Sequence, residues 1–202
     1  MKKNKVFLLV LLVLLMLCTA CGEKKEEPKK GIHFETKDVE KKEEEKKEEK
    51  KQEEEKKLSF ICSNDAIKIE TPNTWKKYTG EQMNKDSCVE LLGTENDKVL
   101  LIISEKKSLF NGFKSWFDIV YGTAKKSYDL DDSQIRRSDE GGLNTRFIEK
   151  ELAVDEENVY LQLYFMETNN YYNQVLMWTE ASNKDLLGNE FRSIAYSLRE
   201  IE

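Results

Sequence analysis

Hydrophobic and polar residues alternate through much of the chain after residue 57, which is the pattern of β-strands with one buried face. The clearest run is Val159–Met166, where every second residue is Val, Leu or Phe. Residues 99–103 are apolar throughout and are expected in the middle of a sheet, covered on both faces. Similar runs predict further strands at 58–62, 67–70, 88–92, 134–137, 143–150 and 171–179.

Short polar turns separate these runs in pairs. Residues 94–98, 140–142 and 169–170 supply the Asn, Asp and Gly residues typical of hairpin connections. Because a hairpin joins neighbouring antiparallel strands, the sheet is predicted to be largely antiparallel. Pro72 cannot extend a central ladder and ends the second strand, and the polar stretch 76–87 is assigned no element.

Two stretches have the spacing of amphipathic helices. Gly122 and the acidic stretch 129–132 are expected to end the first helix, whose apolar face consists of Phe110, Phe113, Phe117, Val120 and Ala124. Residues 182–185 are interpreted as a capping box that opens the second helix, whose apolar face consists of Leu187, Phe191, Ile194 and Leu198. The predicted class is therefore α/β (α+β): a largely antiparallel sheet covered by two helices, either one per face or both on one face.

The segment 1–21 has a different composition from the rest of the chain. It begins with Lys2, Lys3 and Lys5 and continues with twelve uninterrupted apolar residues at 6–17. A membrane-spanning helix needs about 20 such residues, so this run has the length found in a signal peptide. The alternative is an uncleaved apolar anchor whose cysteines are incidental.

Small residues and a cysteine follow the apolar run. The stretch Leu17-Cys18-Thr19-Ala20-Cys21 resembles the lipobox of bacterial lipoproteins, although Cys18 stands where that family has Leu or another aliphatic residue. In that family the final cysteine receives a diacylglycerol and becomes the first residue after cleavage. The resemblance implies lipidation at Cys21 and a membrane-lipid contact in which each buried methylene contributes about 0.8 kcal/mol.

Residues 22–57 are almost wholly charged, with 13 lysines and 14 acidic residues. Such a composition cannot bury a core. Opposite charges three and four residues apart stabilise a helix, whereas the buried positions of a coiled coil would here be charged. We predict a Glu/Lys tether that is disordered or forms a single solvated helix.

Charge and histidine content exclude several functions for the domain at 58–202. The whole chain carries a formal charge of -6, of which the first segment contributes +3 and the tether -1, so the domain carries -8. Nucleic-acid binding needs a basic surface instead. The only histidine, His33, lies in the tether, so the domain cannot hold a Ser/His/Asp triad, a Cys/His pair or a histidine metal site. We expect no cofactor, no metal and no enzymatic activity.

The order of elements and the stretch Thr71-Pro72-Asn73-Thr74-Trp75 resemble the PsbP-like family, named for an extrinsic subunit of photosystem II. Its members have an aromatic-Pro-x-Gly-Trp signature at the end of the second strand, of which Pro72 and Trp75 are present here. The resemblance covers about residues 58–200. It implies an α/β/α sandwich and a non-enzymatic role as an adaptor, assembly factor or ligand-binding module.

Two cysteines remain in the domain, Cys62 and Cys88. A disulfide between them would close a loop of about 26 residues and stabilise the fold by roughly 3.5 kcal/mol in the chain-entropy model. The alternative is a pair of buried thiols. Asp129, Asp131 and Asp132 give a second candidate, either the start of a calcium loop or a solvated turn that caps the helix.

Aromatic residues give a third candidate. An aromatic-lined groove for a peptide or an apolar ligand is one interpretation, and a second core under a helix is the other. The candidate groove residues are Trp75, Tyr160, Tyr164, Tyr172 and Trp178.

We expect an extracytoplasmic lipoprotein, lipid-anchored to the bacterial cell membrane, that acts as a non-catalytic interaction or assembly module on an envelope protein. The alternative is a ligand- or substrate-binding lipoprotein that serves a transporter or a sensor. A deep apolar pocket would favour ligand binding, and a flat exposed apolar patch would favour protein interaction.

Overall fold

The computed structural model describes residues 57–84, 87–94, 98–154 and 157–201. The predictions for the signal segment 1–21, for lipidation at Cys21 and for the tether therefore lie outside the described residues, except that the first strand includes Lys57.

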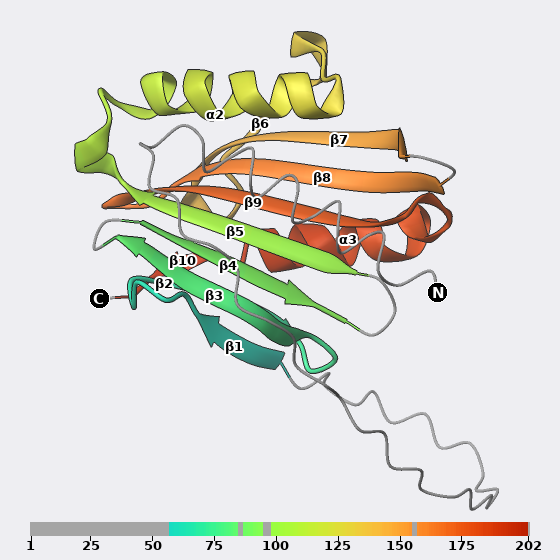
Figure 1. The fold of residues 1–202 in the computed structure, drawn as a ribbon, viewed down its shortest axis with the longest axis horizontal. Coiled ribbons are helices and arrows are strands. Elements are labelled where there is room, and N and C mark those ends of the chain that lie inside the picture. The colour runs from blue at the N-terminus through green and yellow to red at the C-terminus, as the bar shows by residue number, and fades with distance from the viewer. Residues whose placement is uncertain (1–56, 85–86, 95–97, 155–156, 202) are drawn as a thin grey trace, which may run out of the picture. The chain divides into compact units, whose positions relative to one another are not determined.

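A seven-stranded antiparallel sheet forms the centre of the domain (Figure 1). In spatial order its strands are β3 (Lys76–Asn84), β4 (Ser87–Gly93), β5 (Val99–Lys106), β9 (Tyr171–Glu180), β8 (Glu157–Glu167), β7 (Asn144–Val154) and β6 (Arg136–Ser138). Each neighbouring pair is antiparallel. The predicted hairpins are confirmed, and so is the central position of residues 99–103, because β5 pairs with a strand on each side.

A small second sheet joins the beginning and the end of the domain. Its strands are β1 (Lys57–Ile61), β2 (Ile67–Pro72) and β10 (Arg199–Glu200), with β2 in the middle. Both outer strands run antiparallel to β2. Ile67 and Ile69 of β2 are fully buried in one core with Leu100 and Ile102 of the large sheet.

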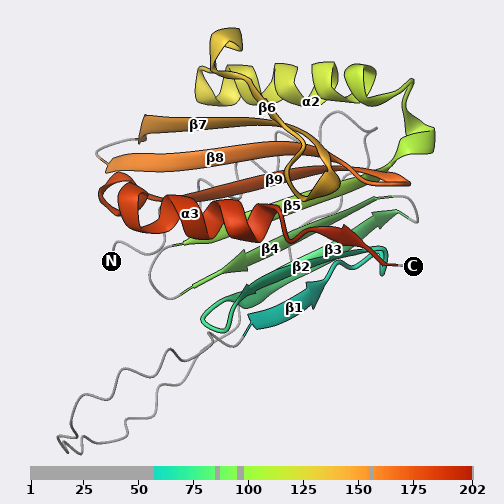
Figure 2. The ribbon, with the colours of Figure 1, turned by 180° about the vertical axis from the view of Figure 1, so that it is seen from behind.

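Two helices cover the large sheet, one on each face (Figures 1 and 2). On one face, α2 (Phe113–Tyr128) places Trp116 and Phe117 against Phe165 of β8. On the other face, α3 (Lys184–Ala195) packs with the small sheet, and its Gly188 carbonyl accepts a hydrogen bond from Gln162 of β8. The alternation predicted for β8 explains this, since Phe165 and Gln162 point to opposite faces.

Helix α2 starts later than predicted and is not ended by Gly122, but it does end at the acidic stretch 129–132. It begins after Gly112, whose φ of 87° is not helical, so Phe110 lies outside the helix. It passes through Gly122 and ends at Asp129, which adopts the left-handed conformation. Phe117 and Ala124 of the predicted face are buried, together with Trp116 and Tyr121, whereas Phe113 and Val120 are half-buried.

The predicted capping box at 182–185 is wrong. A 3-10 turn over Ala181–Asn183 leads directly from β9 into α3, and no side chain caps the first turn of this helix. The Ser182 hydroxyl instead contacts Glu180. Leu198 is buried as expected but lies beyond the end of α3.

Strand β3 is an addition to the prediction. It is an edge strand that pairs only with β4 among the described strands. Its sequence, KKYTGEQMN, has no apolar alternation, and an edge strand does not require one. Within the described residues, no helix is both long enough and apolar enough to cross a membrane.

Candidate functional site

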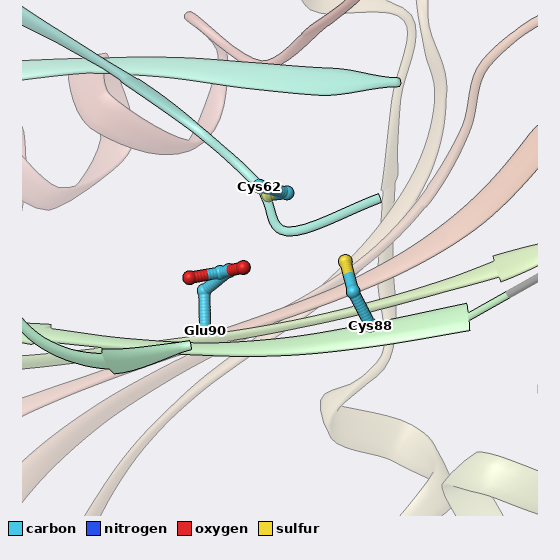
Figure 3. Close-up of side chains that lie close together, drawn as sticks. All are labelled: Cys62, Cys88 and Glu90. Atoms are coloured by element: carbon cyan, nitrogen blue, oxygen red, sulfur yellow. The ribbon is translucent and has the colours of Figure 1, made fainter. Parts of the chain in front are cut away.

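Three chemically reactive side chains meet between the small sheet and β4 (Figure 3). The sulfur atoms of Cys62 and Cys88 and a carboxylate oxygen of Glu90 all lie within 4.8 Å of one another. These residues are at most 2% exposed. The cluster therefore combines two sulfur ligands and one oxygen ligand in a buried place.

Local structure explains why the three side chains meet. Cys88 and Glu90 are two residues apart on β4 and so point to the same face of the sheet. Cys62 follows β1 and opens a tight turn, where its carbonyl accepts a hydrogen bond from the Asp65 amide at 2.9 Å. Asp65 has a positive φ of 55°, a conformation that Asp tolerates better than most residues. This turn holds Cys62 over β4.

Glu90 has polar partners on two sides. Lys77 of β3 forms an ion pair with it, with 2.6 Å between Nζ and Oε2, and the Ser63 backbone amide donates to Oε1. Gly80 lies directly opposite Glu90 in the β3–β4 ladder, and a Cβ atom at Gly80 would overlap the carboxylate. The absence of a side chain at Gly80 gives Glu90 its room.

The two thiols influence each other's acidity. The hydrogen bond with Cys88, burial and the nearby charge of Glu90 raise the pKa of Cys62. The same hydrogen bond lowers the pKa of Cys88, and the backbone amides of Asn64 and Ser104 lower it further. The pKa of Cys88 therefore lies below that of Cys62.

The sequence identified both cysteines but missed the third member. The structure contains Cys62 and Cys88 as adjacent thiols, so the disulfide remains a prediction. The pattern does not single out Glu90, because it lies in the stretch CVELL, whose other residues predict an apolar strand. An acidic residue two positions from a cysteine in such a strand was the available signal, because the period of two places both on one face.

A narrow crevice adjoins the cluster. Its remaining lining is mostly apolar and consists of Phe60, Ile61, Ile69, Lys77, Leu92 and Ile102. It has no room for a sphere the size of a water molecule. It is therefore a packing defect rather than a ligand-binding pocket.

The five candidate groove residues do not share a face. Trp75, Tyr160 and Tyr164 belong to the core under α3, where Trp75 packs against Phe191 with ring centres 6.3 Å apart. Tyr172 lies on the other face and stacks on Trp116 of α2 at 5.2 Å. Trp178, six residues further along β9, is on the Tyr172 face. A single groove made of these five residues is wrong, and the core interpretation describes four of them.

Hydrogen bonds satisfy the polar ends of the buried tyrosines. The Tyr164 hydroxyl donates to Gln162 Oε1 at 2.7 Å, and Gln162 Nε2 donates to the Tyr160 hydroxyl at 2.7 Å. Trp75 Nε1 donates to Glu190 Oε1 of α3 at 3.1 Å. These bonds fix the aromatic residues within the core.

The three aspartates after α2 form a capping turn. Asp131 caps a short 3-10 turn and accepts from the Ser133 amide at 2.8 Å, which lowers the pKa of Asp131. Asp132 accepts from Lys125 and from the Tyr121 hydroxyl, which lowers the pKa of Asp132. Each described carboxylate contact is thus with the protein's own donors, as the capping interpretation expects.

Neither the scan against protein-family profiles nor the search of curated proteins finds a match. Solved structures do match. Cyanobacterial PsbP (CyanoP) from Synechocystis sp. PCC 6803 is 15% identical, with a TM-score of 0.52 over 73% of this chain and 94% of that one. A crystal structure from Bacteroides thetaiotaomicron is 11% identical, with a TM-score of 0.51 over 71% of this chain. This chain spans about half of that longer protein, 48% of its length.

A third match is LpqN, involved in cell envelope biogenesis of Mycobacterium tuberculosis, at 7% identity and a TM-score of 0.48 over 73% of this chain and 91% of that one. Its TM-score is too low to support an inference. At 15% identity the likeness to CyanoP concerns the fold alone. The domain has a PsbP-like fold of the α+β class, as predicted.

Proposed function

We propose that this chain is a lipid-anchored, extracytoplasmic protein that acts as a non-catalytic interaction or assembly module at the bacterial cell envelope. The basic and apolar segment 1–21 and its lipobox-like cysteine, Cys21, support the location. The PsbP-like fold supports an accessory role by likeness. The negative charge of the domain favours protein partners over nucleic acid.

The main support for the interaction role is that most of the candidate groove aromatics are buried in the domain's cores and do not line a pocket. Trp75, Tyr160 and Tyr164 are buried beneath α3, and Tyr172 is buried beneath α2. The crevice beside Cys62 does not admit a water molecule. With its aromatic residues buried, the domain would bind a partner through its outer surface. Large apolar side chains are exposed there at Leu58, Ile61, Tyr78, Leu109, Ile119 and Leu186.

Ligand or substrate binding for a transporter or sensor is the alternative role. It would need an enclosed cavity that buries most of a small molecule. The described crevice gives this alternative no support, so the interaction role is preferred.

Site-specific crosslinking in cells tests the proposal. A photoreactive amino acid would replace Ile61, Ile119 or Leu186, which are 52%, 55% and 77% exposed and lie on β1, α2 and α3. We expect one of the three positions to capture a single dominant protein, identified by mass spectrometry. Failure of all three positions to capture a protein would contradict the interaction role.

The anchor is tested in the same strain with Cys21→Ser. We expect the wild-type chain in the membrane fraction with an acylated N-terminus and the variant without acylation. Capture of the partner should fall in the variant because the anchor concentrates both proteins at one surface. Equal capture by both chains, or an unmodified Cys21 in the wild type, would contradict the lipid anchor.

A further inference from the structure

We propose that Cys62, Cys88 and Glu90 form a structural site for a thiophilic divalent cation, of which Zn²⁺ is the representative. Two thiolates and a carboxylate are a donor set that zinc accepts in proteins. This site is independent of the proposed envelope function, because it concerns the interior of the domain.

The distances permit such a site after a small contraction. Since all three ligand atoms lie within 4.8 Å of one another, some point lies within about 2.8 Å of each of them. Zinc binds sulfur at about 2.3 Å and carboxylate oxygen at about 2.0–2.2 Å. A shift of about 0.5–0.8 Å in each side chain would bring all three ligand atoms to bonding distance from one ion.

Charge balance favours a divalent cation. In the deprotonated state the two sulfurs and Glu90 carry three negative charges, and Lys77 supplies one positive charge beside them. A divalent ion would bring this buried group to neutrality. Without one, burial opposes the charged state of these three groups, each at most 2% exposed.

The surroundings stabilise negative charge at the ligands. The Ser63 backbone amide donates a hydrogen bond to Oε1 of Glu90. Such second contacts orient metal ligands and strengthen binding. A Cys62–Cys88 disulfide would leave Glu90 without a role, whereas a metal ion would take its carboxylate as a third ligand.

Ser104 gives a second, independent indication of a missing ligand. It lies on β5 directly opposite Cys88, so both side chains point to the same face. Its hydroxyl is fully buried and has no hydrogen-bond partner among the described residues. A buried hydroxyl without a partner costs free energy. A metal ion beside Cys88 would give this oxygen a partner and could take it as the fourth ligand.

Cobalt titration tests the site, because tetrahedral cobalt–thiolate sites have intense charge-transfer absorption. The full chain would carry Cys18→Ser and Cys21→Ser, so that Cys62 and Cys88 are its only thiols, and would be kept in detergent with a non-chelating reductant. We expect one cobalt per chain, displacement by Zn²⁺, and a rise of Tm with zinc. No charge-transfer band in the folded chain would overturn the proposal.

Variants assign the ligands. Cys62→Ser and Cys88→Ser should abolish the charge-transfer band, and Glu90→Gln should weaken zinc binding at least tenfold. Glu105→Gln is the matched control, because Glu105 is a half-buried carboxylate on the opposite face of the same sheet. The affinity of this variant for zinc should equal that of the unsubstituted chain. Glu90→Gln is nearly isosteric and remains informative if the cysteine variants fail to fold. Unchanged affinity in Glu90→Gln would overturn this ligand set.

Thiol counting on the same chain, purified from cells without reductant, tests the competing cross-link. Two thiols that react only after denaturation, with one zinc ion per chain released at the same time, would support the metal site. An absence of reactive thiols, with a mass lower by two hydrogens, would identify a Cys62–Cys88 disulfide and overturn the metal-site proposal.

Discussion

Glu90 and Glu105 are two buried or half-buried carboxyl groups on opposite faces of the large sheet. Glu90 has a cation beside it, the Lys77 ammonium at 2.6 Å. Glu105 has a neutral donor instead, the Trp116 indole N–H at 2.8 Å. Burial raises the pKa of Glu105, and the single hydrogen bond from Trp116 opposes that rise only in part.

The substitution Glu105→Gln should therefore stabilise the domain at neutral pH. Because the pKa of Glu105 is higher in the folded than in the unfolded state, protonated Glu105 stabilises the fold. This contribution to the free energy of unfolding is lost as pH rises through the folded-state pKa. Gln keeps an acceptor for Trp116 without the charge. We expect a higher Tm than wild type at pH 7, and no difference below the ordinary Glu pKa of about 4.3.

Calorimetry at both pH values measures this effect, with Glu70→Gln as a control at an exposed strand position. An equal loss of stability at both pH values would show that the Gln side chain simply packs badly and that the charge at Glu105 has no cost.

Two glycines within regular elements should respond to alanine in opposite ways. Gly122 is inside α2, and a Cβ atom added there would have no neighbouring atom within 4 Å, so Gly122→Ala should stabilise by about 0.4–1 kcal/mol. Gly80→Ala would drive a methyl group into the Glu90 carboxylate and should destabilise by about 1–3 kcal/mol. Urea unfolding at pH 7 measures both, and a shift of both variants in the same direction would refute the argument.

The elements could be predicted where a single local pattern determines them. The alternation of β8 and the polar turns of the hairpins are patterns of this kind, and the strands appear as expected. Strand β3 could not be predicted, because its sequence has no apolar alternation and its conformation depends on pairing with β4. The start of α2 depends on the backbone of Gly112, which phenylalanine spacing does not reveal.

The faces of the sheet depend on register between strands, which a pattern within one strand cannot provide. Tyr160 pairs with Thr179, so the even-numbered residues of β8 share a face with the odd-numbered residues of β9. Tyr172 is therefore on the opposite face from Tyr160, and the predicted groove divides into two cores. The cysteine pair was easier to recognise because only two thiols remain in the domain, but its position beside Glu90 depends on the packing of the small sheet over β4.

The strands of the whole molecule should differ in their resistance to opening. Strand β9 pairs with β5 on one side and β8 on the other, and its side chains are buried under both helices. Strand β1 pairs with one strand and is largely exposed. Amide hydrogen exchange should be slowest in β9 and fastest in β1. Protection of β1 equal to that of β9 would contradict this order and would imply that another segment covers β1.

The small sheet also determines how the domain would carry mechanical load. Lys57 pairs with Pro72 and Glu200 with Ile67, so the chain enters and leaves at opposite ends of β2, about 17 Å apart along the strand. Because β1 and β10 run in the same direction on either side of β2, tension between these two points acts along the strands. Such tension loads the hydrogen bonds of the ladder all at once and does not break them one at a time. The small sheet is therefore oriented to resist a pull applied at Lys57 and Glu200.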